Sequence, residues 1–100
     1  MDKNQAIIIA KAYIEIISKK YALNKALLFG SYAKGTFHED SDIDIAIVLK
    51  DNFDLIQMQI DLMKLRRNVD LRIEPHPFNI SNFNTTNPVA FEILKYGFEI

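Results

Sequence analysis

The segment from Asp42 to Leu49 constrains the fold more than any other part of the chain. It is rich in β-branched residues, which favours a β-strand. Successive side chains of a strand point to opposite faces of the sheet. One face carries only apolar side chains, those of Ile43, Ile45, Ile47 and Leu49, and Asp42 and Asp44 begin the other face. The strand therefore predicts a sheet with one apolar face that helices cover and a second, open face that carries acidic side chains.

Further helices and strands are predicted on either side of this strand. Apolar residues at steps of three and four predict a helix over residues 4–21. The short apolar run Ala26–Phe29, which ends at Gly30, predicts a buried strand. The stretch from there to Ser41 is rich in turn residues and has room for one helical turn. Asp51 is expected to cap a helix from Asn52 to about Arg67.

The last third of the chain adds a strand, a loop and a helix. Residues 69–74 predict a strand that Pro75 closes, with Asp70, Arg72 and Glu74 on one face. Residues 75–87 contain two prolines and four asparagines and are expected to form a loop. Asn87 caps a final helix that has Pro88 at its first position and Gly97 past its end, and residues 98–100 add a short strand.

This order predicts an α/β (α+β) fold in two layers, a mixed sheet with helices on one face. The 100 residues are expected to form one domain, residues 1–100. An apolar content of 49% excludes a disordered chain, and the absence of cysteine excludes disulfides, a thiol nucleophile and thiolate zinc sites. A net charge of −1 argues against nucleic-acid binding by bulk electrostatics. The apolar run Ile7–Ala10 is too short to span a membrane, so a cytoplasmic location is expected.

The pattern that carries chemistry is Gly30-Ser31 followed, ten residues later, by Asp42 and Asp44. Two aspartates at i and i+2 of a strand lie on one side, about 6.6 Å apart at their Cα atoms. Their carboxylates suit hard divalent cations, and two such cations stabilise the attacking and leaving oxygens of a phosphoryl transfer. Gly30 lets the backbone approach a phosphate, and Ser31 offers N–H groups and a hydroxyl to an anion. Each half of the pattern, taken alone, is more often an ordinary turn or a pair of solvated acids.

The chain resembles the DNA polymerase beta superfamily of nucleotidyltransferases, and more closely its stand-alone minimal nucleotidyltransferase (MNT) group. The resemblance rests on the motif Gly30-Ser31-Tyr32-Ala33-Lys34-Gly35 followed by Ser41-Asp42-Ile43-Asp44-Ile45-Ala46-Ile47-Val48. Weaker similarity runs through Val69-Asp70-Leu71 and the segment from Ile93 to Gly97.

The resemblance implies a role for each matching residue. Asp42 and Asp44 would hold two Mg²⁺ ions, and Asp70 would be the third carboxylate and the base for the attacking hydroxyl. Gly30 and Ser31 would bind the triphosphate of ATP, the substrate. Lys34 stands where this group often has arginine, and it keeps a positive charge for a phosphate but loses the bidentate fork.

The third carboxylate is a choice between Asp70 and Glu74, because both fall on the same strand face. Asp70 is preferred because it stands at the start of the predicted strand, as Asp42 does, and because Val-Asp-Leu matches the family motif. Parallel pairing of the two strands is expected, since a helix crosses between them. Arg72 is expected to hold Glu74 or to meet a phosphate.

The resemblance also implies a partner, a HEPN-type toxin. The chain would be the antitoxin, which transfers AMP from ATP to a tyrosine hydroxyl of that partner. The alternative is a nucleotide-binding antitoxin module that neutralises its partner by occlusion without significant catalysis. Transfer to a small molecule is a third reading, which the lack of an acceptor domain disfavours.

Several features outside the motif have plainer explanations. Apolar residues cover more than half of the first helix, so a homo- or hetero-oligomer is expected rather than an isolated monomer. His38 is expected to be a solvated loop residue, and His76, between two prolines, to serve only the chain's conformation. Lys64, Arg66 and Arg67 end a predicted helix, where the helix dipole favours cations.

Overall fold

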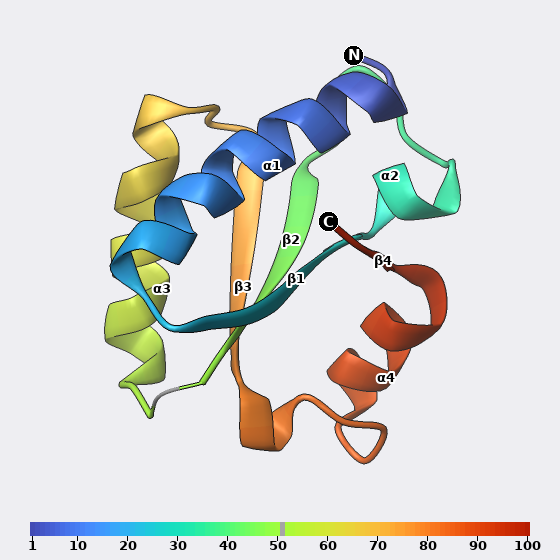
Figure 1. Cartoon of the computed structure of the whole chain (residues 1–100). Coiled ribbons are helices and arrows are strands. Elements are labelled where there is room, and N and C mark those ends of the chain that lie inside the picture. Colours follow the sequence, from blue (N-terminus) through green and yellow to red (C-terminus); the bar gives the residue numbers. More distant parts are fainter. Residues whose placement is uncertain (51) are drawn as a thin grey trace.

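The computed structural model describes residues 1–50 and 52–100, so the predicted cap at Asp51 lies outside the described residues. The elements follow the predicted order of helices and strands (Figure 1). The helices are α1 (Lys3–Lys20), α2 (Ser31–Lys34), α3 (Leu55–Leu65) and α4 (Pro88–Tyr96), with 3₁₀ turns η1 (Arg66–Asn68) and η2 (Ile80–Asn82). The strands are β1 (Leu23–Phe29), β2 (Ile43–Leu49), β3 (Ile73–Asn79) and β4 (Phe98–Glu99).

The four strands form one mixed sheet in the order β3-β2-β1-β4. β1 pairs antiparallel with both β2 and β4, and β2 pairs parallel with β3. The crossover from β2 to β3 passes through α3, as parallel pairing requires. The predicted mixed sheet is therefore confirmed, including the parallel pairing of the two acid-bearing strands.

The main hydrophobic core lies between the sheet and the helices α1 and α3. The predicted apolar face of β2 is fully buried there: Ile43, Ile45 and Ile47 show no exposed surface. Tyr13 of α1 is also completely buried, and its hydroxyl donates a hydrogen bond of 2.6 Å to the carbonyl oxygen of Leu62 in α3. This bond ties the two helices together and satisfies a phenol that burial would otherwise leave unpaired.

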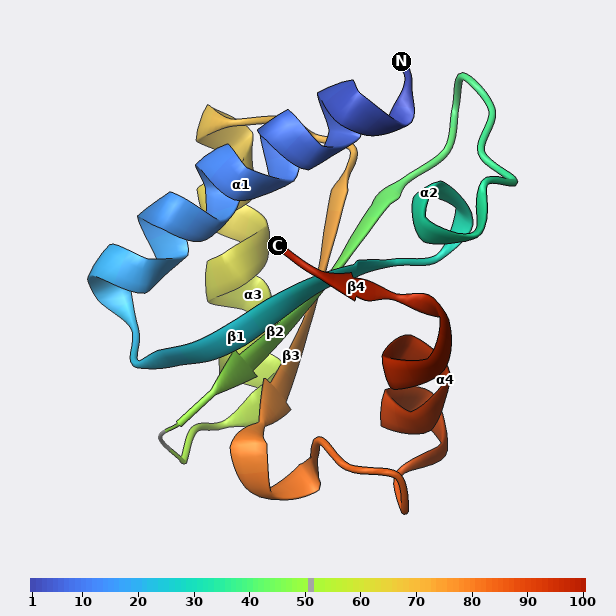
Figure 2. The same cartoon turned by 45° about the vertical axis from the view of Figure 1, so that its right-hand side comes forward.

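The second face of the sheet is not open along its whole length. A smaller cluster there joins Leu27, Ala46 and Val48 of the sheet to Ala90 and Ile93 of α4. Figure 2 shows α1 and α3 on one side of the sheet and α4 on the other. The expectation of helices on one face only is therefore corrected. The end of this face near α2, which carries Asp44, is the part that stays partly exposed.

Strand β3 begins and ends later than predicted, at Ile73–Asn79 instead of residues 69–74, so it contains both Pro75 and Pro77. A proline cannot donate to a sheet ladder, but β3 is an edge strand with one free side. Alternate residues of a strand place their backbone polar groups on the same side, so both prolines face that free side. The amide of Gln59 in α3 confirms the direction, because it donates to the Pro75 carbonyl oxygen at 2.9 Å.

The helix ends show how local caps set the boundaries. Asn87 caps α4, with Pro88 in the first turn and Gly97 at the C-cap, as predicted. Helix α3 differs: it starts at Leu55 and not at Asn52, because the Asp54 carboxylate accepts the hydrogen bond of the Gln57 N–H at 2.9 Å. The helical turn predicted after Gly30 is α2.

Candidate active site

Gly30 joins the end of β1 to α2 and lies directly against Asp44. The neighbouring Phe29 is the register partner of Asp44 across the antiparallel β1–β2 pair. The Gly30 backbone has φ +73° and ψ −149°, a combination that is open almost only to glycine. A Cβ at this position would collide with the Oδ2 atom of Asp44. Only glycine therefore lets this turn pass next to the carboxylate, and Ser31 begins α2 immediately after it.

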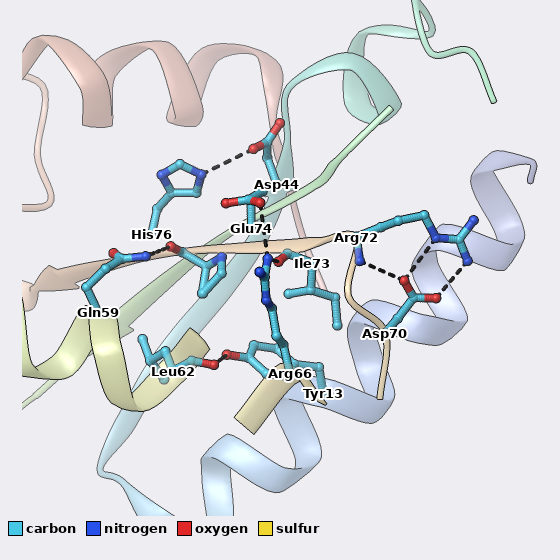
Figure 3. A network of polar contacts seen from close by, with 11 residues as sticks. Tyr13, Asp44, Gln59, Leu62, Arg66, Asp70, Arg72, Ile73, Glu74 and His76 are labelled. Carbon is cyan, nitrogen blue, oxygen red and sulfur yellow. Dashed lines mark hydrogen bonds and ion pairs between the residues drawn. The ribbon is translucent and has the colours of Figure 1, made fainter. Parts of the chain in front are cut away.

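Asp44 of β2 is the centre of a small group of polar side chains, which also contains Glu74 and His76 of β3 (Figure 3). Glu74 is its register partner across the parallel β2–β3 pair, so the two carboxylates stand on adjacent strands at the same level. His76 lies two residues further along β3, and its Nε2 is 3.2 Å from Asp44 Oδ1. The ring of Phe29 meets that imidazole edge to face, with 4.9 Å between centroids.

Asp42 precedes β2 and is exposed to solvent. One residue, Ile43, separates it from Asp44, so the strand pleat brings both aspartates to one side, about 6.6 Å apart at Cα. The loop before it is tied by Ser41, which is buried and whose Oγ accepts the His38 N–H at 2.9 Å. The loop thus presents Asp42 beside Asp44, and the side chain of Asp42 extends into solvent.

Asp70 does not stand at the start of β3, which corrects the argument that favoured it as third carboxylate. It lies in the turn three residues before the strand, and Arg72 holds it by two hydrogen bonds, at 2.9 Å from Nε and 2.7 Å from Nη2. These bonds from Arg72 hold the pKa of the Asp70 carboxyl below its ordinary value. Figure 3 shows this pair set apart from Asp44 and Glu74.

The arginine that holds Glu74 is Arg66; of the two roles expected for Arg72, the contact with Glu74 is not formed. Nη1 of Arg66 donates to Glu74 Oε1 at 3.1 Å and to the carbonyl oxygen of Ile73 at 2.8 Å. Arg66 is the C-cap residue of α3, where the helix dipole favours a cation, and its bonds to Glu74 and Ile73 give this charge a second role. The guanidinium fixes one oxygen of the carboxylate at the sheet edge.

Lys34 is turned toward α4 and is not among the groups gathered at Asp44. Its Nζ is 3.1 Å from Glu92 Oε1 and 4.9 Å from the centroid of the Tyr96 ring. About half of each partner's side chain is exposed, so this ion pair is weak in water. A phosphate near Gly30 would compete with Glu92 for the ammonium group.

The donor chemistry at Asp44 fits a divalent cation. Asp42, Asp44 and Glu74 offer carboxylate oxygens, which Mg²⁺ prefers, and a cation relieves the repulsion between them. Within residues 1–50 and 52–100 no group of three histidine, aspartate or glutamate side chains is close enough to hold a metal ion as it stands. The exposed Asp42 side chain and the Arg66-bound Glu74 would have to turn toward Asp44 when a cation arrives.

The sequence interpretation ended the strand at Pro75 and therefore did not place Glu74 and His76 together beside Asp44. Had the strand been continued through the prolines as an edge strand, alternation would have put Glu74 and His76 on the same face.

Comparison with known proteins places the chain in a family. The model described as "Polymerase beta, Nucleotidyltransferase" matches residues 11–100. The chain therefore belongs to the polymerase beta nucleotidyltransferase family, as its Gly-Ser and Asp-x-Asp geometry indicates, and it is a nucleotidyltransferase. Within residues 1–50 and 52–100, no helix is both long and apolar enough to cross a lipid bilayer.

Two relatives come from Methanocaldococcus jannaschii. "Putative protein adenylyltransferase MJ0141" is 33% identical over 83 residues, which cover 81% of this chain and 82% of the relative. "Putative protein adenylyltransferase MJ0604" is 41% identical over 58 residues, which cover 56% of this chain. That match spans about half of MJ0604, 55% of its length.

Solved structures share the fold. A "putative nucleotidyltransferase" from Sulfolobus solfataricus superposes with a TM-score of 0.71 at 19% identity, over 97% of this chain and 80% of that one. A toxin–antitoxin structure with AMP-PNP gives a TM-score of 0.60 at 26% identity, over 99% and 72%. A tyrosine-to-alanine mutant of the toxin–antitoxin MntA-HpeT gives 0.59 at 26%, over 100% and 72%.

Alanine substitutions at the two glycines with positive φ should separate backbone strain from damage to the site. Gly35 has φ +77° and open space where a Cβ would stand, so Gly35→Ala should cost only the strain of a left-handed alanine, about 1–2 kcal/mol. Gly30→Ala carries a larger strain, because this combination of φ and ψ is open almost only to glycine, and it also displaces Asp44. We expect both variants to fold and only Gly30→Ala to lose Mg-ATP binding, measured by calorimetry. Equal loss of binding in both variants would contradict the contact between Gly30 and Asp44.

The Asp70–Arg72 pair predicts a stability difference that depends on pH. The folded-state pKa of Asp70 lies below its unfolded value of 3.8, so its contribution is complete above that value and is lost as the pH falls through the folded-state pKa. Asp70→Asn should therefore lower the midpoint of thermal unfolding at pH 7, and the difference from wild type should shrink as the pH falls below 3.8. Arg72→Gln should show the same dependence. A constant difference across this range would contradict the pair.

Proposed function

We propose that the protein transfers AMP from ATP, with Mg²⁺, to a tyrosine hydroxyl of a HEPN-type partner toxin, and that it acts as the antitoxin. The observation that carries the proposal is the parallel register that sets Glu74 beside Asp44, with Gly30 against the same carboxylate. The relatives' names support protein adenylylation, and the likeness to a toxin–antitoxin structure with AMP-PNP supports both the nucleotide and the partner. A tyrosine as the acceptor is what the resemblance to the MNT group implies.

In this proposal Asp42, Asp44 and Glu74 hold the metal ions, and Glu74 replaces Asp70 as the third carboxylate. Bound Mg²⁺ would supply charge stabilisation for the α-phosphate and the leaving pyrophosphate. The backbone at Gly30 and Ser31 approaches the phosphates closely because no Cβ intervenes. Lys34 releases Glu92 and contacts the phosphates at the mouth of the site. Asp70 keeps a structural role, in its ion pair with Arg72.

The reaction forms a bond between the acceptor oxygen and the α-phosphorus and breaks the bond to the β-phosphate oxygen. Pyrophosphate leaves, and the hydroxyl proton passes to the Glu74 carboxylate. Arg66 holds Glu74 Oε1 at 3.1 Å, so the other oxygen, Oε2, is the one that faces the site. The imidazole of His76 holds Asp44 Oδ1 at 3.2 Å, so it orients the Oδ2 oxygen toward Gly30.

The ranking of three acidic variants tests this assignment. Asp42→Asn combined with Asp44→Asn should abolish AMP transfer to a co-expressed HEPN-type partner, measured as the mass increase of that partner. Glu74→Gln should slow transfer by about 10²–10⁴-fold, the scale of general-base catalysis. Asp70→Asn is the matched control, because it changes a carboxylate on the same segment outside the site, and its transfer rate should change by less than about threefold.

Two outcomes would overturn the assignment. If Asp70→Asn loses activity and Glu74→Gln keeps it, the third carboxylate is Asp70, and the β2–β3 register does not define the site. If the double variant transfers no AMP and still neutralises the partner as well as wild type does, the protein acts by occlusion. Circular dichroism of each variant separates these outcomes from unfolding.

A further inference from the structure

A groove runs along the outer side of α3, beside the turn that leads into β3. Its volume is about 280 Å³. Apolar side chains of Ile60, Met63 and Leu71 line it together with the cationic side chains of Lys64, Arg66 and Arg67. It lies outside the group of residues at Asp44, on the opposite side of the β3 edge from β2.

The large apolar side chains that line the groove are exposed to solvent. Leu71 is 66% exposed and Ile60 is 44% exposed. Ile56, four residues before Ile60 on the same face of α3, is 75% exposed. Large apolar side chains that gather on a surface and stay in water mark an interface, because covering them releases free energy.

The charge of the groove specifies what covers it. Three cations line it, although the whole chain has a net charge of −1. Arg66 is paired with Glu74, whereas Lys64 and Arg67 form no ion pair with any residue of the described ranges 1–50 and 52–100. An apolar strip flanked by unpaired cations is complementary to an amphipathic segment with acidic residues beside its apolar face.

Arg66 connects the groove to the candidate active site. The same guanidinium that lines the groove donates to Ile73 O at 2.8 Å and to Glu74 Oε1 at 3.1 Å. A protein bound in the groove is therefore separated from Glu74 by one side chain. A substrate protein held there keeps its acceptor hydroxyl close to the active site, so the reaction no longer needs a separate encounter in solution.

We propose that this groove is the docking site for the protein substrate and that it takes an acidic amphipathic helix of that substrate. The proposal rests on the proposed function and adds the chemistry that the partner must carry next to its acceptor hydroxyl. The helix lays its apolar residues on Ile60, Met63 and Leu71 and its carboxylates against Lys64 and Arg67.

The test uses a fluorescein-labelled peptide of 18 residues, with leucine at helical spacing and glutamate elsewhere, and measures its binding by fluorescence anisotropy. We expect the wild-type chain to bind this peptide and to bind the matched lysine peptide at least tenfold more weakly. Lys64→Glu combined with Arg67→Glu should weaken binding of the glutamate peptide at least tenfold. Lys11→Glu combined with Lys50→Glu is the control, because it makes the same charge change at exposed lysines outside the groove, and it should bind as wild type does.

Two further measurements keep docking and catalysis apart. The Asp42→Asn and Asp44→Asn double variant should bind the glutamate peptide like wild type, and the Lys64→Glu and Arg67→Glu variant should bind Mg-ATP like wild type. Equal peptide binding by the groove variant and wild type, or no binding by wild type, would overturn the docking site and leave the nucleotide site standing. Tighter binding of a 12-nucleotide single-stranded RNA than of the peptide, lost in the groove variant, would overturn it in favour of a nucleic-acid partner.

Discussion

The parallel pairing of β2 with β3 decides where the acidic groups of the site lie. It matches Asp44 to Glu74 across adjacent strands, and a shift by one residue would turn Glu74 to the buried face, toward α1 and α3. The register is held by burial, because Ile43 and Ile73 are paired to each other and both are fully buried. The chemistry of the second face thus depends on the packing of the first.

Because β3 is an edge strand, its outer side also makes contacts that shape the surface next to the site. One side of the strand pairs with β2, and the other side offers carbonyl oxygens to side chains of α3 and of the turn that follows it. Gln59 and Arg66 use them, at Pro75 and Ile73. These contacts cover an edge that would otherwise remain open to other chains, and the two prolines add no donors to it. Because Arg66 also holds Glu74, the cover of the edge and the active site share one guanidinium group.

Sequence reasoning was sufficient wherever a local signal fixed the structure. The strand around Ile43–Leu49, the turn at Gly30 and the capped helix after Asn87 each follow from side-chain alternation, a positive-φ glycine or a cap. It failed at β3, because whether a proline is tolerated depends on the strand's place in the sheet, which a single segment does not show. The strand-position argument for Asp70 over Glu74, and the interpretation of His76 as only conformational, both assumed that the strand ends at Pro75. The cover of α4 on the second face was also missed, since the amphipathic pattern of a helix does not say which face it will meet.

The central claim is that Asp42, Asp44 and Glu74, beside the Gly30 turn, form a divalent-metal site that receives ATP. The most direct measurement is isothermal titration calorimetry of ATP into the wild-type protein, once with Mg²⁺ and once with a chelator. We predict binding that requires Mg²⁺, because the carboxylates repel a triphosphate until a cation neutralises them. Equal affinity for ATP with Mg²⁺ and with the chelator would contradict the account.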